Sequence, residues 1–455
     1  MLLVAMLLLA VNLFTAGVNI RPFVFMLGGL MVAVIAFTSI ELSLYLLILS
    51  TLLSPEIVFG GPTAAEIAMG KATVTQSRGV TLRLDDMLLT IISISWLFRM
   101  ALNKELGLIR STPLNGPIAW YWVATLIATL IGMFAGRVGT MGLFFVIKYL
   151  EYFVLFYVVV NQTHDGASVR RYLAVILFTC LIASLIGIGQ IPSGERVSAP
   201  FEGEQGEPNT FGGYLVLMFS LCMGLLLHSE KGRARLILQA LMAIVLVPLA
   251  FTESRSSYLA LIVSFGLLVW YADRKRTLLL VTLAGMALVP FILPQNVVNR
   301  VLYTFTQAEE AGQLQLGEVR IDTSTTERLR SWQNVAINEF PNHPLFGHGV
   351  TGGPFMDAQY PRVLAETGVL GLLLFFWLLH RIWTILRSAF DDLVDPWLRG
   401  AALGTLCGYG GLLVHAVGAN SFIIVRIMEP LMILVGLLLA AAIAQKNAEV
   451  ATPDR

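Results

Sequence analysis

Long apolar runs, separated by short polar connections, make up most of the chain. A helix needs about 20 mostly apolar residues to cross the hydrocarbon core of a bilayer. By that rule the sequence predicts an all-α polytopic membrane protein with about 14 transmembrane helices. The pattern is weakest at the third and fourth spans, and a very tight turn is predicted between the last two. The spans centre near residues 2–19, 23–40, 42–58, 85–100, 117–135, 140–160, 172–190, 211–228, 236–253, 256–271, 278–293, 366–386, 398–418 and 421–442.

The lengths of the connections predict four parts. Residues 1–293 should carry membrane helices with short outer loops, and residues 366–442 should carry the last membrane helices. Residues 294–365 form one large loop between them, and residues 443–455 are expected to be a cytoplasmic tail. Loops as long as 294–365 are uncommon and usually functional.

The large loop is predicted to contain a short helix. Between residues 324 and 340, apolar side chains recur at helical spacing. Just beyond this stretch, prolines and glycines between residues 341 and 349 impose turns. The apolar positions that define the helix are Leu329, Trp332, Val335, Ala336 and Phe340.

Lysine and arginine in the short connections predict the orientation, because such residues favour the cytoplasmic side. They gather at 170–171, 231–235, 273–276 and 380–387. With these connections inside, both termini are cytoplasmic. The connections that then lie on the outer, periplasmic face are 59–84, 191–210, 251–257 and 294–365.

The composition agrees with a lipid environment. Charged residues make up 13% and hydrophobic residues 56% of the chain, whereas a soluble domain carries about 25% charged residues. A net charge of +1 gives no basic field, so nucleic acid is not an expected partner. The first 18 residues, which lack a basic start and a cleavage site, are interpreted as a membrane helix.

Several kinds of chemistry have no support in the sequence. It contains no P-loop, HExxH, GxSxG or aspartate-rich metal box, which argues against ATP hydrolysis and metalloprotease activity. His343 and His348 have no third ligand nearby, so no metal site and no cofactor are expected. A reaction must therefore use polar residues of the outer face.

Two outer arginines are candidate anion ligands. Arg196 is the only cation of loop 191–210 and either binds a phosphate or pairs with one of the three glutamates that follow it. Arg255 lies in the turn 251–257 and either pairs with Glu253 or holds an anionic head group. The residues alone leave both choices open.

Two further groups of charged residues also have alternative interpretations. Lys148 and Glu151 lie inside an apolar run and form either a neutralised pair in the bundle interior or part of a substrate cavity. Asp357, shortly before the next predicted span, is either a general base or an ordinary turn residue.

The order of several motifs resembles the bacterial O-antigen ligase/polymerase family, which contains lipopolysaccharide ligases and Wzy-type polysaccharide polymerases. The resemblance is strongest over roughly residues 190–380, and it rests on the order of the motifs together with the topology. The motifs are Thr252-Glu-Ser-Arg-Ser-Ser257, Arg328-Leu-Arg-Ser-Trp332, Asn342-His-Pro-Leu-Phe-Gly-His-Gly349 and Leu364-Ala-Glu-Thr-Gly-Val-Leu-Gly371, with a weaker likeness from Arg196 to Gly213.

The resemblance implies a GT-C-like, metal-independent, inverting glycosyltransferase that works at the periplasmic face of the inner membrane. Its donor would be a glycan on undecaprenyl pyrophosphate, with Arg196 and Arg255 as pyrophosphate ligands. The family's catalytic histidine aligns with Asp357, a departure that favours a polymerase over a ligase. Glu366 is the second candidate base. The remaining expected substrate-binding residues are Arg328, Arg330, Trp332, Gln359 and Tyr360.

Three alternatives remain to this interpretation. The runner-up within the enzyme class is an O-antigen ligase that transfers the glycan to lipid A–core. A lipid-linked glycan flippase is less expected, because the sequence shows no duplicated halves. A scaffold of a polysaccharide export complex would not need its outer arginines. Expected partners are the lipid-linked glycan, membrane lipid, and other assembly proteins such as a flippase and a chain-length regulator.

Overall fold

The computed structural model describes residues 31, 34–35, 38–59, 80–102, 110–202, 206–230, 232–272, 315–316, 319–320, 323–354 and 356–451. The predicted spans at 2–19 and 278–293, and most of the span at 23–40, lie outside these residues. Most of the outer connection 59–84 and of the loop 294–322 also lies outside them.

The described part of the chain is mainly helical. Seven of its helices are long and apolar enough to cross a membrane, and two more are shorter apolar helices. The protein is therefore a multi-pass membrane protein, whereas the expected number of about 14 spans is not confirmed. The helices are α3 (Ile40–Leu53), α5 (Leu84–Leu102), α6 (Asn115–Phe134), α7 (Thr140–Lys148), α8 (Glu151–Gln162), α9 (Gly166–Gln190), α10 (Pro208–His228), α11 (Arg233–Phe251), α12 (Arg255–Tyr271), α15 (Thr323–Asn334), α16 (Phe340–Asn342), α17 (Gln359–Asp392), α18 (Pro396–His415) and α19 (Val425–Ala451), with the 3₁₀ turn η1 (Ile191–Ser193) and the π-helical η3 (Val335–Glu339).

Two short antiparallel strand pairs were not predicted. β1 (Glu56–Phe59) pairs with β2 (Val80–Arg83), and β3 (Gln315–Leu316) pairs with β4 (Val319–Arg320). The predicted span at 42–58 is therefore too long, since α3 ends at Leu53. β-branched residues, which favour strands, recur in the first pair.

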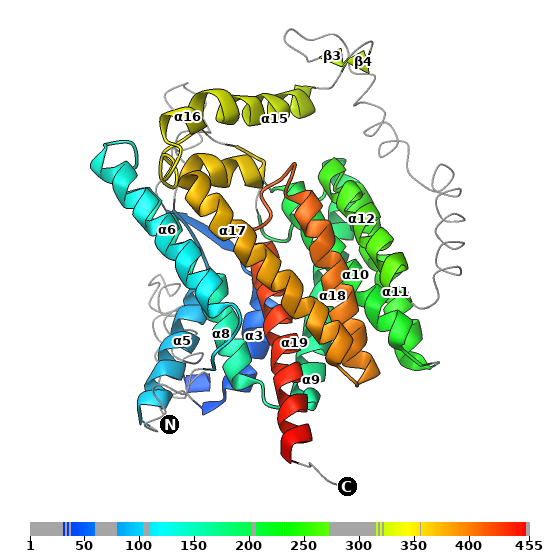
Figure 1. The fold of residues 1–455 in the computed structure, drawn as a ribbon. Helices are drawn as coiled ribbons and strands as arrows, with labels where there is room; N and C mark the ends of the chain where they lie inside the picture. The colour runs from blue at the N-terminus through cyan, green and yellow to red at the C-terminus, as the bar shows by residue number, and fades with distance from the viewer. Residues whose placement is uncertain are drawn as a thin grey trace, which may run out of the picture.

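The helices form a bundle with two distinct ends (Figure 1). We call the end covered by α15 and α16 the upper end, and the opposite end, where α19 terminates, the lower end. Through the centre of the bundle run α10 and α19, whose apolar segments are 83% and 78% buried, against 33% for α11. The described parts of the connections 191–210 and 251–257 thus meet at the end of a closely packed core.

The lower end collects arginines of the connections predicted to be cytoplasmic. Arg170 forms an ion pair with Asp395, whose carboxylate also caps the N-terminus of α18. Arg171 pairs with Glu41 at 2.8 Å. Such residues in short connections favour the cytoplasmic side, so the predicted orientation places the lower end in the cytoplasm.

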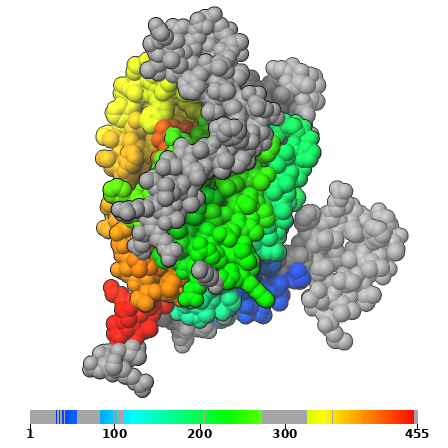
Figure 2. All heavy atoms as spheres, turned by 90° about the vertical axis from the view of Figure 1, so that its right-hand side faces the viewer, coloured from blue at the N-terminus to red at the C-terminus, as the bar shows by residue number. Residues whose placement is uncertain are grey.

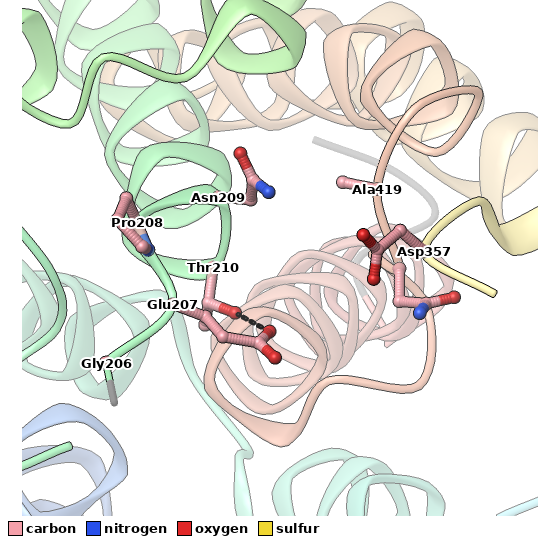
Figure 3. A pocket seen from close by; sticks show the side chains of 8 residues that line it. Gly206, Glu207, Pro208, Asn209, Thr210, Asp357 and Ala419 are labelled. Atoms are coloured by element: carbon pink, nitrogen blue, oxygen red, sulfur yellow. Dashed lines mark hydrogen bonds between the residues drawn. The ribbon is translucent and has the colours of Figure 1, made fainter. Parts of the chain in front are cut away.

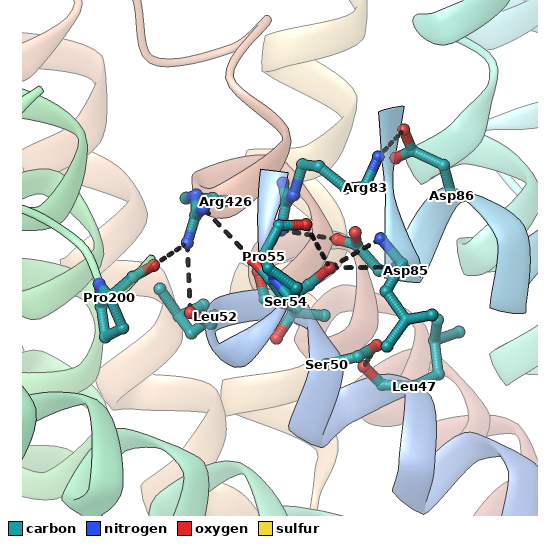
Figure 4. A network of polar contacts seen from close by, with 12 residues as sticks. Leu47, Ser50, Leu52, Ser54, Pro55, Arg83, Asp85, Asp86, Pro200 and Arg426 are labelled. Carbon is teal, nitrogen blue, oxygen red and sulfur yellow. Dashed lines mark hydrogen bonds and ion pairs between the residues drawn. The ribbon is translucent and has the colours of Figure 1, made fainter. Parts of the chain in front are cut away.

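A buried network of charges lies inside the bundle (Figure 4). Lys148 Nζ forms an ion pair with Asp86 at 2.9 Å, a partner that the sequence did not predict. Glu151 also interacts with Asp86. Arg83 pairs with Asp85 at 2.6 Å, and both side chains are almost fully buried. The interior interpretation of Lys148 is therefore correct, although the network is larger than a pair.

Arg426, at the start of α19, is the largest fully buried side chain of the described residues. Its guanidinium donates to the carbonyl oxygens of Leu52 at 3.1 Å and Pro200 at 2.9 Å. It also forms an ion pair with Glu202 at 3.3 Å. The residue therefore joins α3 and the connection before α10 to α19.

The segment after α16 is fixed against the first turns of α17. The His348 and Gly349 amides donate to Ala365 O at 2.8 Å and Glu366 O at 2.9 Å. Gly368 has φ +65°, and a Cβ there would lie 2.4 Å from Leu345 O. Only glycine fits this backbone and this close approach. The Glu-Thr-Gly and Phe-Gly-His-Gly motifs therefore form one structural unit.

Three predicted boundaries were wrong. Helix α17 begins at Gln359, before the expected end of the large loop at 365. Helix α19 continues to Ala451, because the expected tail is rich in strong helix formers such as alanine, glutamine and lysine. The last two spans are not joined by a tight turn, since α18 ends at His415 and α19 begins at Val425. The apolar side chains of residues 416–424 concealed this connection.

Candidate active site

The turn before α12 brings two predicted arginines together. Arg196 donates from Nε to Thr252 O at 3.0 Å and from Nη2 to Glu253 O at 3.2 Å. Ser254 caps α12 by accepting from the Ser257 amide at 3.3 Å. Arg255 is the first residue of the helix. Arg196 thus donates to two turn carbonyls, beside Arg255 and the positive end of the α12 dipole.

Arg328 of α15 approaches the same place from above. A Cβ built on Gly418 would lie 2.7 Å from Ser256 Oγ and 4.0 Å from Arg328 Nη1. Arg328 is therefore near the connection 416–424 and the first turn of α12. Three arginines from separate parts of the sequence surround the start of one helix, an arrangement suited to a doubly charged anion.

A pocket of about 310 Å³ opens beside Asn209, which accepts a hydrogen bond from Ser254, the residue before Arg255 (Figure 3). Its volume is at the lower end of the range of about 300–1,000 Å³ for small-ligand sites. One wall is the start of α10, and across the pocket Asp357 and Ala419 face it. The lining residues are Gly206, Glu207, Pro208, Asn209, Thr210, Asp357, Ala419 and Asn420.

A chain of buried hydrogen bonds leads from α18 to this pocket. His415 Nδ1 is 2.8 Å from Ser421 Oγ, and His415 Nε2 is 3.1 Å from Ser257 Oγ. Ser257 donates to Ser254 Oγ at 2.8 Å, and Ser254 donates to Asn209 Oδ1 at 2.7 Å. We call these five residues the relay. All four hydrogen bonds can form at once if Ser421 donates to His415 Nδ1 and His415 Nε2 donates to Ser257.

Two adjacent glycines of α10 make the relay possible. A Cβ on Gly212 would lie 2.2 Å from Ser257 Oγ, and a Cβ on Gly213 would lie 3.2 Å from the His415 ring. The start of α10 therefore approaches α12 and α18 more closely than any side chain would allow. This accounts for the glycines in the Asn209-Thr-Phe-Gly-Gly213 motif.

Asp357 is the predicted base that lines the pocket, whereas Glu366 occupies a different environment. Glu366 is buried, and its Oε1 accepts from Arg362 Nε at 3.0 Å and from the Thr351 amide at 3.5 Å. Asp357 is exposed. Of the two carboxylates, only Asp357 lines the described pocket.

The remaining predicted ligands divide into two groups. Gln359 and Tyr360 fasten α17 to the end of α18: Gln359 Oε1 accepts from the Phe422 amide at 3.0 Å, and Tyr360 donates to Leu413 O at 2.6 Å. Arg330 and Trp332 are exposed on α15. None of these four lines the pocket. Figure 2 shows a small orange-red patch, the colour of the α18–α19 region, between yellow and green atoms at the upper end.

Burial also affects a histidine outside the pocket. His343 Nε2 is 3.1 Å from Arg137 Nη1. Burial, and then the Arg137 charge, lower the pKa of His343 below its usual value. The neutral ring can accept a hydrogen bond from Arg137, which connects the upper end of α6 to the large loop.

The sequence did not single out Glu207, Asn420 or His415. His415 and Asn420 were hidden in an apolar stretch interpreted as a span and a tight turn. The one signal available in the sequence was a histidine at the end of an apolar, glycine-rich run. A buried imidazole needs hydrogen-bond partners, so such a histidine points to a polar site nearby.

A comparison with protein-family models finds a match to the family described as O-antigen ligase over residues 240–376. The matched region contains most of α11, all of α12 and α15 and the first half of α17, and therefore Arg255 and Asp357. It covers less than a third of the chain. No curated protein matches the chain.

The match confirms the resemblance to the O-antigen ligase/polymerase family. Members of this family are glycosyltransferase-like enzymes of membranes, and their substrates are lipid-linked glycans. The match does not separate polymerase from ligase, and it gives no support to a flippase.

Proposed function

We propose that the protein is a polysaccharide polymerase that joins oligosaccharide repeat units carried on undecaprenyl pyrophosphate. The reaction takes place at the upper end of the bundle, which faces the periplasm of a bacterial inner membrane. The observation that carries this proposal is the position of the Asp357 pocket beside the arginine-rich start of α12. Carboxylate and cations are the two kinds of group that the transfer requires.

The transfer needs no metal in this mechanism. The acceptor hydroxyl attacks C1 of the donor sugar, and the C1–O bond to the diphosphate breaks with inversion. Arg196, Arg255 and Arg328 stabilise the charge that develops on the leaving diphosphate. Asp357 takes the hydroxyl proton as general base. The apolar helices below hold the polyprenyl tail.

Asp357 also favours the polymerase over the ligase. A histidine at this position can act as a cation toward phosphate, whereas aspartate is restricted to accepting a proton or a hydrogen bond. A ligase that transfers to lipid A–core remains the second candidate. The two differ in the acceptor, so purified protein given lipid-linked repeat unit alone should form polymer only if it is a polymerase.

Arginine substitutions test the diphosphate site. Arg255→Ala and Arg196→Ala should abolish polymer in cells while the protein remains in the membrane, because the leaving group loses its counter-charge. Arg233→Ala, at the exposed lower end of α11, is the matched control. Normal polymer yield and length in both upper-end variants would exclude the diphosphate role.

The base is tested separately. Asp357→Asn keeps the shape of the side chain and removes its basicity, so the transfer rate should fall by about 10²–10⁴-fold. Asp392→Asn, an exposed aspartate at the lower end of α17, is the control. An unchanged rate in Asp357→Asn would assign the base elsewhere, with Glu366 the next residue to test.

A further inference from the structure

The pocket in front of Asp357 has a chemistry that differs from that of the arginine cluster. Asp357 and Glu207 bring two carboxylates to its lining, and the lining contains no lysine or arginine. Such a surface repels anions. The diphosphate and the group that occupies this pocket must therefore be chemically distinct.

The two asparagines of the pocket are held in defined orientations. Asn420 Nδ2 donates to Met356 O at 2.8 Å, and its Oδ1 is buried with no hydrogen-bond partner among the described residues. Asn209 Oδ1 accepts from Ser254 at 2.7 Å. Its amide NH₂ is then the group left to donate into the pocket. His415, which also interacts with the backbone of Asn209, fixes this orientation through the relay.

Together the carboxylates can accept hydrogen bonds from several donors of a ligand, and the Asn209 NH₂ can donate to an acceptor of the ligand. Sugar hydroxyls, each with one donor and two lone pairs, satisfy that pattern. A carboxylate or phosphate, which only accepts, would face the like-charged carboxylates of Asp357 and Glu207. We infer that this pocket is the acceptor subsite and that it takes an uncharged, hydroxyl-rich sugar rather than a uronic acid or a phosphorylated sugar.

This inference rests on the proposed function, and it adds the class of the acceptor sugar. It also assigns Asn209 as a substrate-binding residue and His415 as a positioning residue that acts through Ser257 and Ser254. Asp357 then meets one of the bound hydroxyls, and the neighbouring arginines hold the donor diphosphate. The attacking oxygen and the leaving group thus occupy separate electrostatic environments.

Binding of simple sugars tests the subsite without turnover. The full-length protein in detergent micelles is titrated with a methyl hexoside and with the matching methyl hexuronide, and binding is followed by saturation-transfer NMR. We expect the neutral hexoside to bind at least about tenfold more tightly, because a bound carboxylate would face like charge. In Asp357→Asn combined with Glu207→Gln this preference should fall to within about threefold.

A second variant separates charge from hydrogen bonding. Asn209→Ala should weaken both sugars to a similar degree, by about tenfold, because it removes the amide donor that the relay orients. Asn338→Ala, an exposed asparagine of η3, should leave both affinities unchanged.

Three results would overturn the inference. These are no saturable binding of the hexoside, equal or tighter binding of the hexuronide by the unmodified protein, or a preference that survives in the double variant. Thermal unfolding of each variant in the same micelles identifies any that fail to fold, and the unmodified protein alone then decides between the two sugars. Sugar binding without polymer formation would count against the polymerase and leave the subsite standing. Efficient polymerisation onto a repeat that ends in a uronic acid would overturn the subsite alone.

Discussion

Replacing Ser257 by alanine isolates the energy of the relay. The hydroxyl is fully buried, lies 3.1 Å from His415 Nε2 and donates to Ser254 at 2.8 Å. Ser254 keeps its bond to Asn209, so the main loss is the buried hydrogen bond between His415 Nε2 and the Ser257 hydroxyl. A buried polar group that loses its partner costs about 1–3 kcal/mol. We expect Ser257→Ala to lower the free energy of unfolding by that amount.

The same helix offers a matched control. Ser264 of α12 is also fully buried, but its Oγ has no hydrogen-bond partner among the described residues. Removing that hydroxyl should change the stability by about zero or stabilise slightly. Equilibrium unfolding in mixed detergent micelles, followed by tryptophan fluorescence, measures both variants. A Ser264→Ala cost equal to that of Ser257→Ala would refute the energetic argument.

Acceptor kinetics separate a positioning role from a purely structural one. In Ser257→Ala, the KM for the acceptor should rise by about tenfold with a smaller change in kcat, since Asn209 loses its fixed orientation. In an Asn209→Ala background the same change should add little, because the two residues act through one network. An unchanged acceptor KM, or fully additive effects, would restrict the relay to a structural role.

Three further variants test the fold. Arg426→Met should lower the free energy of unfolding by about 3–5 kcal/mol, because it leaves a buried carboxylate unpaired, and adding Glu202→Gln should recover part of the loss in the same unfolding assay. Glu429→Gln should be at least as stable as the unmodified protein, because the fully buried Glu429 carboxyl lies beside the Asp85 carboxyl and a neutral amide removes charge repulsion between them; a large loss of stability would show that the carboxyl makes a contact that the amide cannot replace. Gly368→Ala should cost at least about 1–3 kcal/mol, seen as reduced yield and lower melting temperature, and a neutral result would exclude the strained backbone at φ +65°.

The sequence was informative where one physical signal dominated. Apolar runs located every span that falls on described residues, because nothing but lipid solvates such segments. Arg255 stood out because a cation between two apolar runs needs an explanation, and Arg196 stood out as the only cation of its loop. Their proximity could not be read from the chain, because it depends on how the carbonyls of Thr252 and Glu253 fold onto Arg196.

The missed residues share a different property. Asn420 and His415 sit among small and apolar neighbours, so hydropathy placed them in a span and a turn. Lys148 found its partner in Asp86, 62 positions earlier in the chain. Pairings of this kind depend on which helices become neighbours, and periodicity within one segment carries no information about that.

The exposed apolar side chains of the upper helices also bear on the depth in the membrane at which the proposed reaction takes place. Leu329 of α15 is 40% exposed, Ile337 of η3 60% and Leu345 61%. Side chains of this kind, together with Trp332, settle among lipid head groups. In the orientation proposed above, the arginines of the upper end then lie near the phosphates of the outer leaflet. The proposed donor, a polyprenyl-linked sugar, could then enter the site sideways with its tail still dissolved in the bilayer, and only the growing glycan would have to enter water.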